Sequence, residues 1–86
     1  MPTISMFFGI AIRIYYDDHP PPHFHAYYGP DAGIIEIETL RVVSGRFPRR
    51  ALAMVLEWAA YRREELRRDW ALAEGHQPLE PIAPLE

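Results

Sequence analysis

The chain has 86 residues, which is enough for one domain and leaves no room for a second hydrophobic core. It contains no cysteine, so disulfides and thiolate-bound metals are excluded. The formal net charge of −3 argues against a protein that binds polyanions over its whole surface, and the longest apolar run, residues 6–12, is too short to cross a membrane. Because no basic segment at the start marks a secretory signal, we expect a soluble cytoplasmic protein.

Alternating apolar and polar side chains predict an antiparallel sheet in the first half of the chain. The pattern indicates strands over residues 3–8, 10–16, 23–28 and 33–39, with a short fifth strand around 41–44. Gly9 interrupts the first apolar run, and a proline-rich loop precedes the third strand. A turn over residues 29–33 then joins the third strand to the fourth, so these two strands should form a hairpin.

The hairpin can pair in few ways, because the apolar residues of both strands have to face the core together. A hairpin centred on residues 30–31 achieves this and places His25 opposite Glu36 and His23 opposite Glu38. A slip of two residues changes the partners but keeps all four polar side chains on one face. We therefore expect one face of the sheet to carry two histidines and two glutamates.

A helix should follow the sheet. Pro48 suits the first position of a helix and Gly75 suits the position just past its end. We predict one long helix over about residues 48–74, packed on one face of the sheet, with a bend allowed near residues 68–69. The predicted fold class is therefore α+β: a small antiparallel sheet of about four to five strands over residues 3–44, one long C-terminal helix and an extended proline-rich tail.

The predicted helix carries more apolar surface than one small sheet can cover. A flanking patch consists of Met54, Trp58, Tyr61 and Leu72. Such a patch predicts an interface with a partner protein, with a second copy of the chain in a homodimer, or with the chain's own tail. The tail, residues 76–86, has a proline at every third position and one apolar edge, as a polyproline II segment would. We assign the whole chain, residues 1–86, to a single domain.

The segment from His19 to Ala26, His-Pro-Pro-Pro-His-Phe-His-Ala, is the main candidate for a functional site. Its prolines stiffen the connection between the first two histidines, and His23 and His25 point to one face of an extended strand. Imidazoles bind zinc, copper, nickel or iron, and carboxylates can complete the shell, so a divalent transition metal is a candidate cofactor. The candidate ligands are His19, His23, His25, Glu36 and Glu38. The same three histidines are the candidate catalytic residues for acid–base chemistry, and a purely structural role is the alternative.

All nine basic residues are arginine, and they are unevenly distributed. The candidates for contact with an anion or nucleic acid have no acidic residue among them: Arg41, Arg46, Arg49 and Arg50. The last two begin the predicted helix, where they oppose its dipole unless an anion or an acidic partner sits there. Tyrosines that could stack on bases are Tyr15, Tyr27 and Tyr28, although such residues on a small sheet more often only pack. A solvated arginine-rich surface is the alternative.

Several segments together resemble the bacterial domain of unknown function 4160 family. They are residues 1–5, the histidine–proline segment, residues 34–38, 48–52 and 56–58, and Arg63-Glu64-Glu65-Leu66 with Trp70. Family members usually carry two prolines between the first two histidines, and this chain carries three. The resemblance implies a small bacterial cytoplasmic protein whose gene often lies beside one for a domain of unknown function 2442, in arrangements like toxin–antitoxin pairs. It implies no activity, catalytic residue or cofactor.

Three functions are therefore open. We expect an interaction protein that forms one component of a toxin–antitoxin-like pair, with the neighbouring gene product as its partner. The alternatives are a metal-binding site and an acid–base nuclease site acting on RNA, both built on the three histidines of the motif. The sequence does not decide whether the protein is an enzyme.

Overall fold

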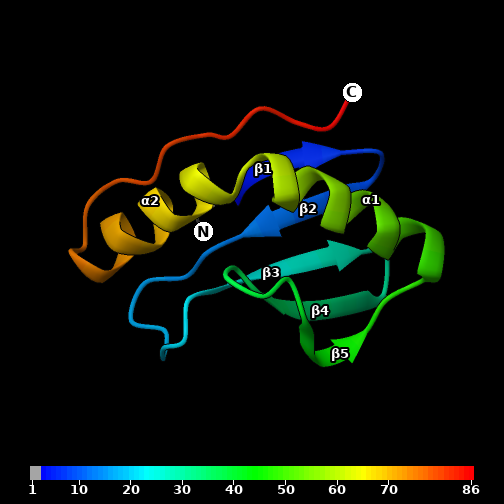
Figure 1. Ribbon diagram of the computed structural model, residues 1–86, viewed down its shortest axis with the longest axis horizontal. Helices are drawn as coiled ribbons and strands as arrows, with labels where there is room; N and C mark the ends of the chain where they lie inside the picture. The colour runs from blue at the N-terminus through cyan, green and yellow to red at the C-terminus, as the bar shows by residue number, and fades with distance from the viewer. Residues whose placement is uncertain (1–2) are drawn as a thin grey trace.

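The computed structural model describes residues 3–86 (Figure 1). Met1 and Pro2, which belong to the segment that carries the family resemblance, lie outside the described residues. Five strands form one antiparallel sheet in chain order: β1 (Thr3–Phe7), β2 (Ile10–Arg13), β3 (His23–Tyr28), β4 (Asp31–Glu36) and β5 (Val42–Arg46). Helices α1 (Arg49–Tyr61) and α2 (Arg63–Glu74) cover one face of it, which confirms the α+β class. Within residues 3–86 neither helix is long and apolar enough to cross a membrane.

Side-chain alternation gives the sheet one buried face and one open face. Ile12 of β2, Phe24 and Ala26 of β3 and Ile35 of β4 are fully buried in the core that the helices share. Complete burial of a large apolar side chain stabilises the fold by about 1.5–3 kcal/mol. The residues between these positions point the other way and are only partly buried. The polar side chains of the three central strands therefore lie together on the open face.

The β3–β4 hairpin turns at residues 29–30, one residue earlier than predicted. The glycine at the first of these positions has a φ of 57°, which a glycine adopts without steric cost, and the proline follows it. The predicted register is therefore wrong by two residues, because the turn sets the pairing of both strands. His23 faces Glu36 and His25 faces Ile34.

Two strands end earlier than predicted. β2 stops at Arg13, and Asp17 then turns the chain with a φ of 61°. β4 stops at Glu36, whose carbonyl accepts the N–H of Leu40, a residue with a φ of 59°. The chain between β2 and β3 is thus free to fold back over the start of β3 rather than extend the sheet.

The prediction of one long helix is wrong, because the chain forms two helices that meet at Arg62. Arg62 has a φ of −109°, outside the helical range, and the break lies well before residues 68–69. It occupies a core-facing position of the apolar stripe, between Ala59 and Leu66, where an arginine cannot be buried. The helix is interrupted where its apolar stripe is interrupted.

Residues 76–86 form no helix or strand and pack against β1 and α1. The N–H of Ile82 donates to the carbonyl of Ile4 at 2.7 Å, and the indole N–H of Trp58 donates to the carbonyl of Ala83 at 2.7 Å. The tail therefore lies along the outer edge of β1 and covers Trp58. Of the three interfaces predicted for the flanking patch, Trp58 makes the one with the chain's own tail.

Asp69 ties the tail to α2 and should make stability depend on pH. It is 1 % exposed, its Oδ1 accepts the N–H of Glu80 at 2.9 Å, and its Oδ2 has no partner among residues 3–86. Burial raises the pKa of Asp69 above 3.8, although the hydrogen bond from Glu80 opposes this. Because the folded state takes up this proton more readily, the carboxyl contributes most to stability at low pH, and its contribution falls as pH rises through the raised pKa.

We expect Asp69→Asn, which has no proton to lose, to gain stability relative to the natural protein as the pH rises above 3.8 and through the raised pKa of Asp69. Urea denaturation at a series of pH values measures the difference in unfolding free energy. The matched control is Glu74→Gln, at an exposed residue of the same helix. Parallel pH profiles of the natural protein and Asp69→Asn would contradict the assignment.

Candidate functional site

The loop between β2 and β3, residues 14–22, carries the first half of the site. Its end is fixed to the sheet, because the carbonyl of Pro22 accepts the N–H of Ile37 at 3.0 Å. The left-handed conformation of Asp17 turns the chain, and the N–H of His19 donates to Oδ1 of Asp18 at 3.2 Å. These contacts hold the Asp18 side chain over the start of β3.

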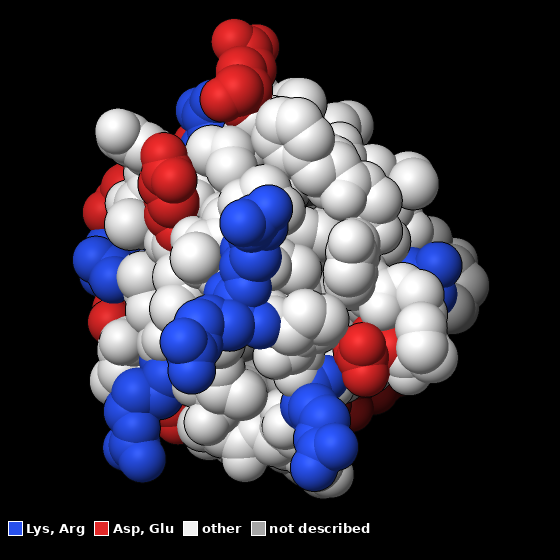
Figure 2. All heavy atoms as spheres, turned by 90° about the vertical axis from the view of Figure 1, so that its right-hand side faces the viewer, with Lys and Arg blue, Asp and Glu red and all other residues white. Residues whose placement is uncertain are grey.

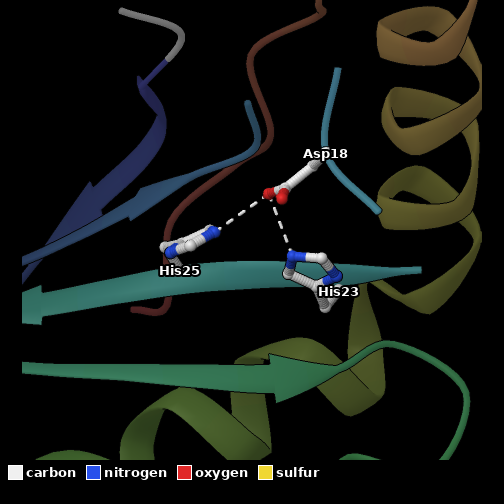
Figure 3. Close-up of side chains that lie close together, drawn as sticks. All are labelled: Asp18, His23 and His25. Atoms are coloured by element: carbon white, nitrogen blue, oxygen red, sulfur yellow. Dashed lines mark hydrogen bonds and ion pairs between the residues drawn. The ribbon is translucent and has the colours of Figure 1, made fainter. Parts of the chain in front are cut away.

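Asp18, His23 and His25 meet at this point (Figure 3). Oδ2 of Asp18 lies 2.9 Å from Nε2 of His23 and 3.1 Å from Nε2 of His25. The side chains of His23, His25 and Asp18 are 12 %, 18 % and 25 % exposed. All three ligand atoms lie within 4.8 Å of one another, so one small cation could contact all three. β3 supplies both imidazoles on one face, and the loop brings the carboxylate from above.

The other nitrogen of His23 decides what the site can hold. Nδ1 lies 2.8 Å from the carbonyl of Pro21. A carbonyl only accepts, so Nδ1 carries a proton and donates it. Nε2 then points at the Asp18 carboxylate with either a second proton or a bare lone pair. Two lone pairs at 2.9 Å would repel, so either a proton or a metal ion has to lie between them.

Asp18 supplies the negative charge of this cluster. Burial raises the pKa of Asp18, but the hydrogen bond from His25, the charge and hydrogen bond of His23 and the N–H of His19 together outweigh it, and the pKa lies below its usual 3.8. Asp18 is therefore ionised at neutral pH. An ionised carboxylate between two imidazoles suits a cation and, until a cation is bound, disfavours an anion.

Aromatic rings surround the histidines. The Trp70 ring from α2 lies 5.1 Å from that of His23, and the Tyr15 ring meets His25 edge-on at 4.7 Å. The Tyr15 and Tyr27 hydroxyls are hydrogen-bonded at 2.7 Å. Burial and this bond raise the pKa of Tyr27 to about 12, so the phenol stays uncharged. An open cleft of about 190 Å³ lies between the loop and α2 and gives access to Asp18.

Three of the five candidate ligands lie outside the cluster. His19 is exposed, and only its backbone N–H touches Asp18. Glu36 shares the face with His23 but accepts the hydroxyl of Thr39 at 2.7 Å. Glu38 lies past the end of β4, where it forms an ion pair with Arg67 of α2 at 2.7 Å. The expectation that Glu38 lies on the face of the histidines is wrong, because β4 has already ended.

Sequence reasoning missed Asp18. Its signal was present, since an aspartate pair directly precedes the histidine–proline segment and carboxylates commonly complete histidine metal sites. The prediction took its carboxylates from the opposite strand because a regular hairpin has a calculable geometry. The position of Asp18 depends instead on how a loop folds back, which strand periodicity does not describe.

Three of the four candidate arginines lie apart from the histidines; the exception is Arg41, whose carbonyl accepts the N–H of Glu36, the residue paired with His23. Arg41, Arg46, Arg49 and Arg50 are exposed and form no ion pair within residues 3–86. Helix α1 begins at the opposite end of the sheet from the loop of Asp18 (Figure 1). At that end arginines are spread over the surface with few acidic side chains between them (Figure 2). Arg49 and Arg50 belong to the helical layer, whereas Arg46 pairs with Ala32 on the open face.

The flanking helical patch is mostly covered. Trp58 is buried beneath the tail, so it is not available to a partner in this state. Met54 and Leu72 are partly buried. Tyr61, at the end of α1, is 76 % exposed and is the member of the patch that stays accessible.

The comparisons with known proteins address the family. No curated protein and no solved structure matches the chain. One family model does match, that of a domain of unknown function (DUF4160), over residues 9–71. The match spans most of the chain and contains Asp18, His23 and His25. The chain belongs to this family.

Proposed function

We propose that this protein binds a divalent transition metal ion through Nε2 of His23, Nε2 of His25 and Oδ2 of Asp18. One observation carries the proposal: the Pro21 carbonyl holds the proton of His23 on Nδ1, so that Nε2 points at the carboxylate. A histidine that ligates a metal almost always donates its other N–H in this way, which fixes the tautomer and the ring orientation.

The distances support the same reading. Zinc bonds of about 2.0–2.1 Å in a tetrahedron separate neighbouring ligand atoms by about 3.3 Å. The separations of 2.9 Å and 3.1 Å at Asp18 reach that value with shifts of a few tenths of an ångström. Two imidazoles and one carboxylate form the donor set of catalytic zinc and of non-haem iron sites, both of which keep a position open. The cleft beside Asp18 leaves room for a water molecule or a substrate there.

Such an ion would act as a Lewis acid and lower the pKa of a bound water towards about 7. The chain's own residues orient the ligands: Pro21 holds His23, and the N–H of His19 holds Asp18. Metal-assisted hydrolysis is therefore the activity to assay, and it includes the nuclease alternative. The imidazolium–carboxylate pair, which would serve acid–base chemistry, needs no metal, and metal analysis separates the two.

We expect the untagged protein to bind one equivalent of zinc, and His23→Ala and Asp18→Ala to lose it. Zinc at 100 times its dissociation constant should stabilise the natural protein by about 2.7 kcal/mol. For a domain of this size that corresponds to a rise in Tm of roughly 10–20 °C. Elemental analysis gives the stoichiometry, thermal unfolding monitored by circular dichroism gives the Tm, and cobalt in place of zinc gives a visible absorption band.

The matched control is His19→Ala, which removes an exposed histidine of the same loop and should leave zinc binding unchanged. A protein that takes up no zinc, cobalt, nickel or copper, and whose Tm does not respond to them, would exclude the metal site. The imidazolium–carboxylate pair would then be the species at Asp18.

A protein partner is the second candidate function, and the open edge of the sheet favours it. All five residues of β5 are exposed, including Val42 and Val43, and no strand of residues 3–86 pairs with its outer side. Such an edge can accept a strand from another chain. The family resemblance points to the neighbouring gene product as that chain, in a toxin–antitoxin-like pair.

Val43→Lys should abolish co-purification with the neighbouring gene product, because a charge in the middle of an edge strand opposes strand addition. The control is Met6→Lys, at a residue of β1 that is more exposed than Val43, on a strand whose outer edge the tail already covers. Co-expression followed by size-exclusion chromatography measures the complex and also detects a homodimer. Retention of the complex by Val43→Lys would exclude this edge as the interface.

A further inference from the structure

We propose that the open face of the sheet binds single-stranded nucleic acid, with bases on its tyrosines and a phosphate between Arg13 and the site of Asp18, His23 and His25. Only the position of that phosphate depends on the proposed metal; the aromatic and arginine contacts do not. Strand register carries the proposal, because it collects these side chains from strands far apart in the sequence.

Two rows of side chains cross the open face at right angles to the strands. The first row is Met6, Ala11, Tyr27, Ala32 and Arg46. The second row is Thr3, Arg13, His25, Ile34 and Ser44. Both helices pack on the opposite face, and the side chains at the centre of these rows are partly exposed.

Aromatic rings occupy the middle of the face. The Tyr27 ring lies nearly parallel to that of His25, at 9° and 6.4 Å, and the Tyr15 ring stands edge-on to His25. The bond between the two tyrosine hydroxyls fixes both rings in place. Rings held in this way on an open sheet present stacking surfaces to bases at little entropic cost. Tyr28 takes no part, because its ring packs against Phe47.

Arginines lie on both sides of these rings. The guanidinium of Arg13 lies 5.1 Å from the centre of the Tyr27 ring, and its Nε donates to the hydroxyl of Thr3. Neither Arg13 nor Arg46 forms an ion pair within residues 3–86. Asp18 and Glu36, the carboxylates nearest the histidines, already accept hydrogen bonds from His23, His25 and Thr39. The cations of the face are therefore available to a polyanion.

A hollow on the same face borders His25. It has a volume of about 180 Å³, and small residues line it beside His25 and Ile34: Ala32, Gly33, Ser44 and Gly45. Gly45 cannot be replaced without disturbing it, since a Cβ there would lie 2.2 Å from the carbonyl of Ala32. A base placed in this hollow would contact His25, which lies two residues from Tyr27 on the same strand.

The shape and chemistry of the face favour a single strand over a duplex. Stacking needs the faces of unpaired bases, which a duplex hides. The arginines would attract either a phosphate backbone or an acidic peptide. The aromatic rings between them favour a nucleic acid, because its bases can stack on these rings.

Fluorescence anisotropy with a labelled single-stranded RNA of roughly ten nucleotides tests the proposal. The titration is run once in chelator and once with one equivalent of zinc. In chelator we expect Tyr27→Ala to weaken binding roughly 5- to 150-fold, and Arg13→Gln to weaken it and lower the slope of log affinity against log salt by about 0.7. Tyr27→Phe keeps the ring and should bind nearly as the natural protein does, which separates stacking from any disturbance of the fold.

The matched control is Arg50→Gln, which removes a more exposed arginine from the helical layer and should leave affinity unchanged. Zinc should tighten binding by the natural protein and not by His23→Ala. Absence of binding with and without zinc, equal affinity for duplex, or full affinity in both Arg13→Gln and Tyr27→Ala would overturn the proposal. RNA binding in chelator by a protein that takes up no zinc would exclude the metal and leave the face standing. Zinc uptake without RNA binding would exclude the nucleic-acid face and leave the metal site standing.

Discussion

The burial of Phe24 and Ala26 beneath the helices determines which way every other side chain of β3 points. In a strand the alternate positions have no choice, so His23, His25 and Tyr27 face solvent together. A slip of one residue would bury two histidines and expose Phe24, at a cost of several kcal/mol, so the core maintains the arrangement. The direction in which the side chains of the site point is therefore set by the burial of the apolar residues of β3, and less by contacts among the polar groups themselves.

Asp18 links the loop between β2 and β3 to this rigid strand through one atom, its Oδ2. Oδ2 faces both imidazoles, so any cation that enters has to satisfy three groups at once. Because Pro21 holds the far side of His23, the ring cannot turn away without losing a hydrogen bond. His25 in turn touches Tyr15 and Tyr27, so the cation site and the tyrosines of the open face share a residue.

Periodicity predicted most of the fold, because burial on one face is a local property of each strand. It gave β3 its bounds and placed both histidines on one face. It could not give the register of the β3–β4 hairpin, since Gly29 and Pro30 allowed more than one turn and the choice moved the pairing by two residues. It also could not place Asp18, because a loop that folds back has no period. The break at Arg62 was visible as an arginine within the apolar stripe, although the predicted bend lay near residues 68–69.

The two edges of the sheet differ, and the difference limits how copies of this protein can assemble. The tail occupies the outer side of β1 through the bond from Ile82 to Ile4, while β5 has no such cover. A sheet open at both edges can add molecules indefinitely, as fibres do. Here association through β5 consumes the only uncovered edge within the described residues, so a symmetric pair is closed and growth stops at two. The proline-rich end of the chain thereby blocks strand addition at one of the two edges of the sheet.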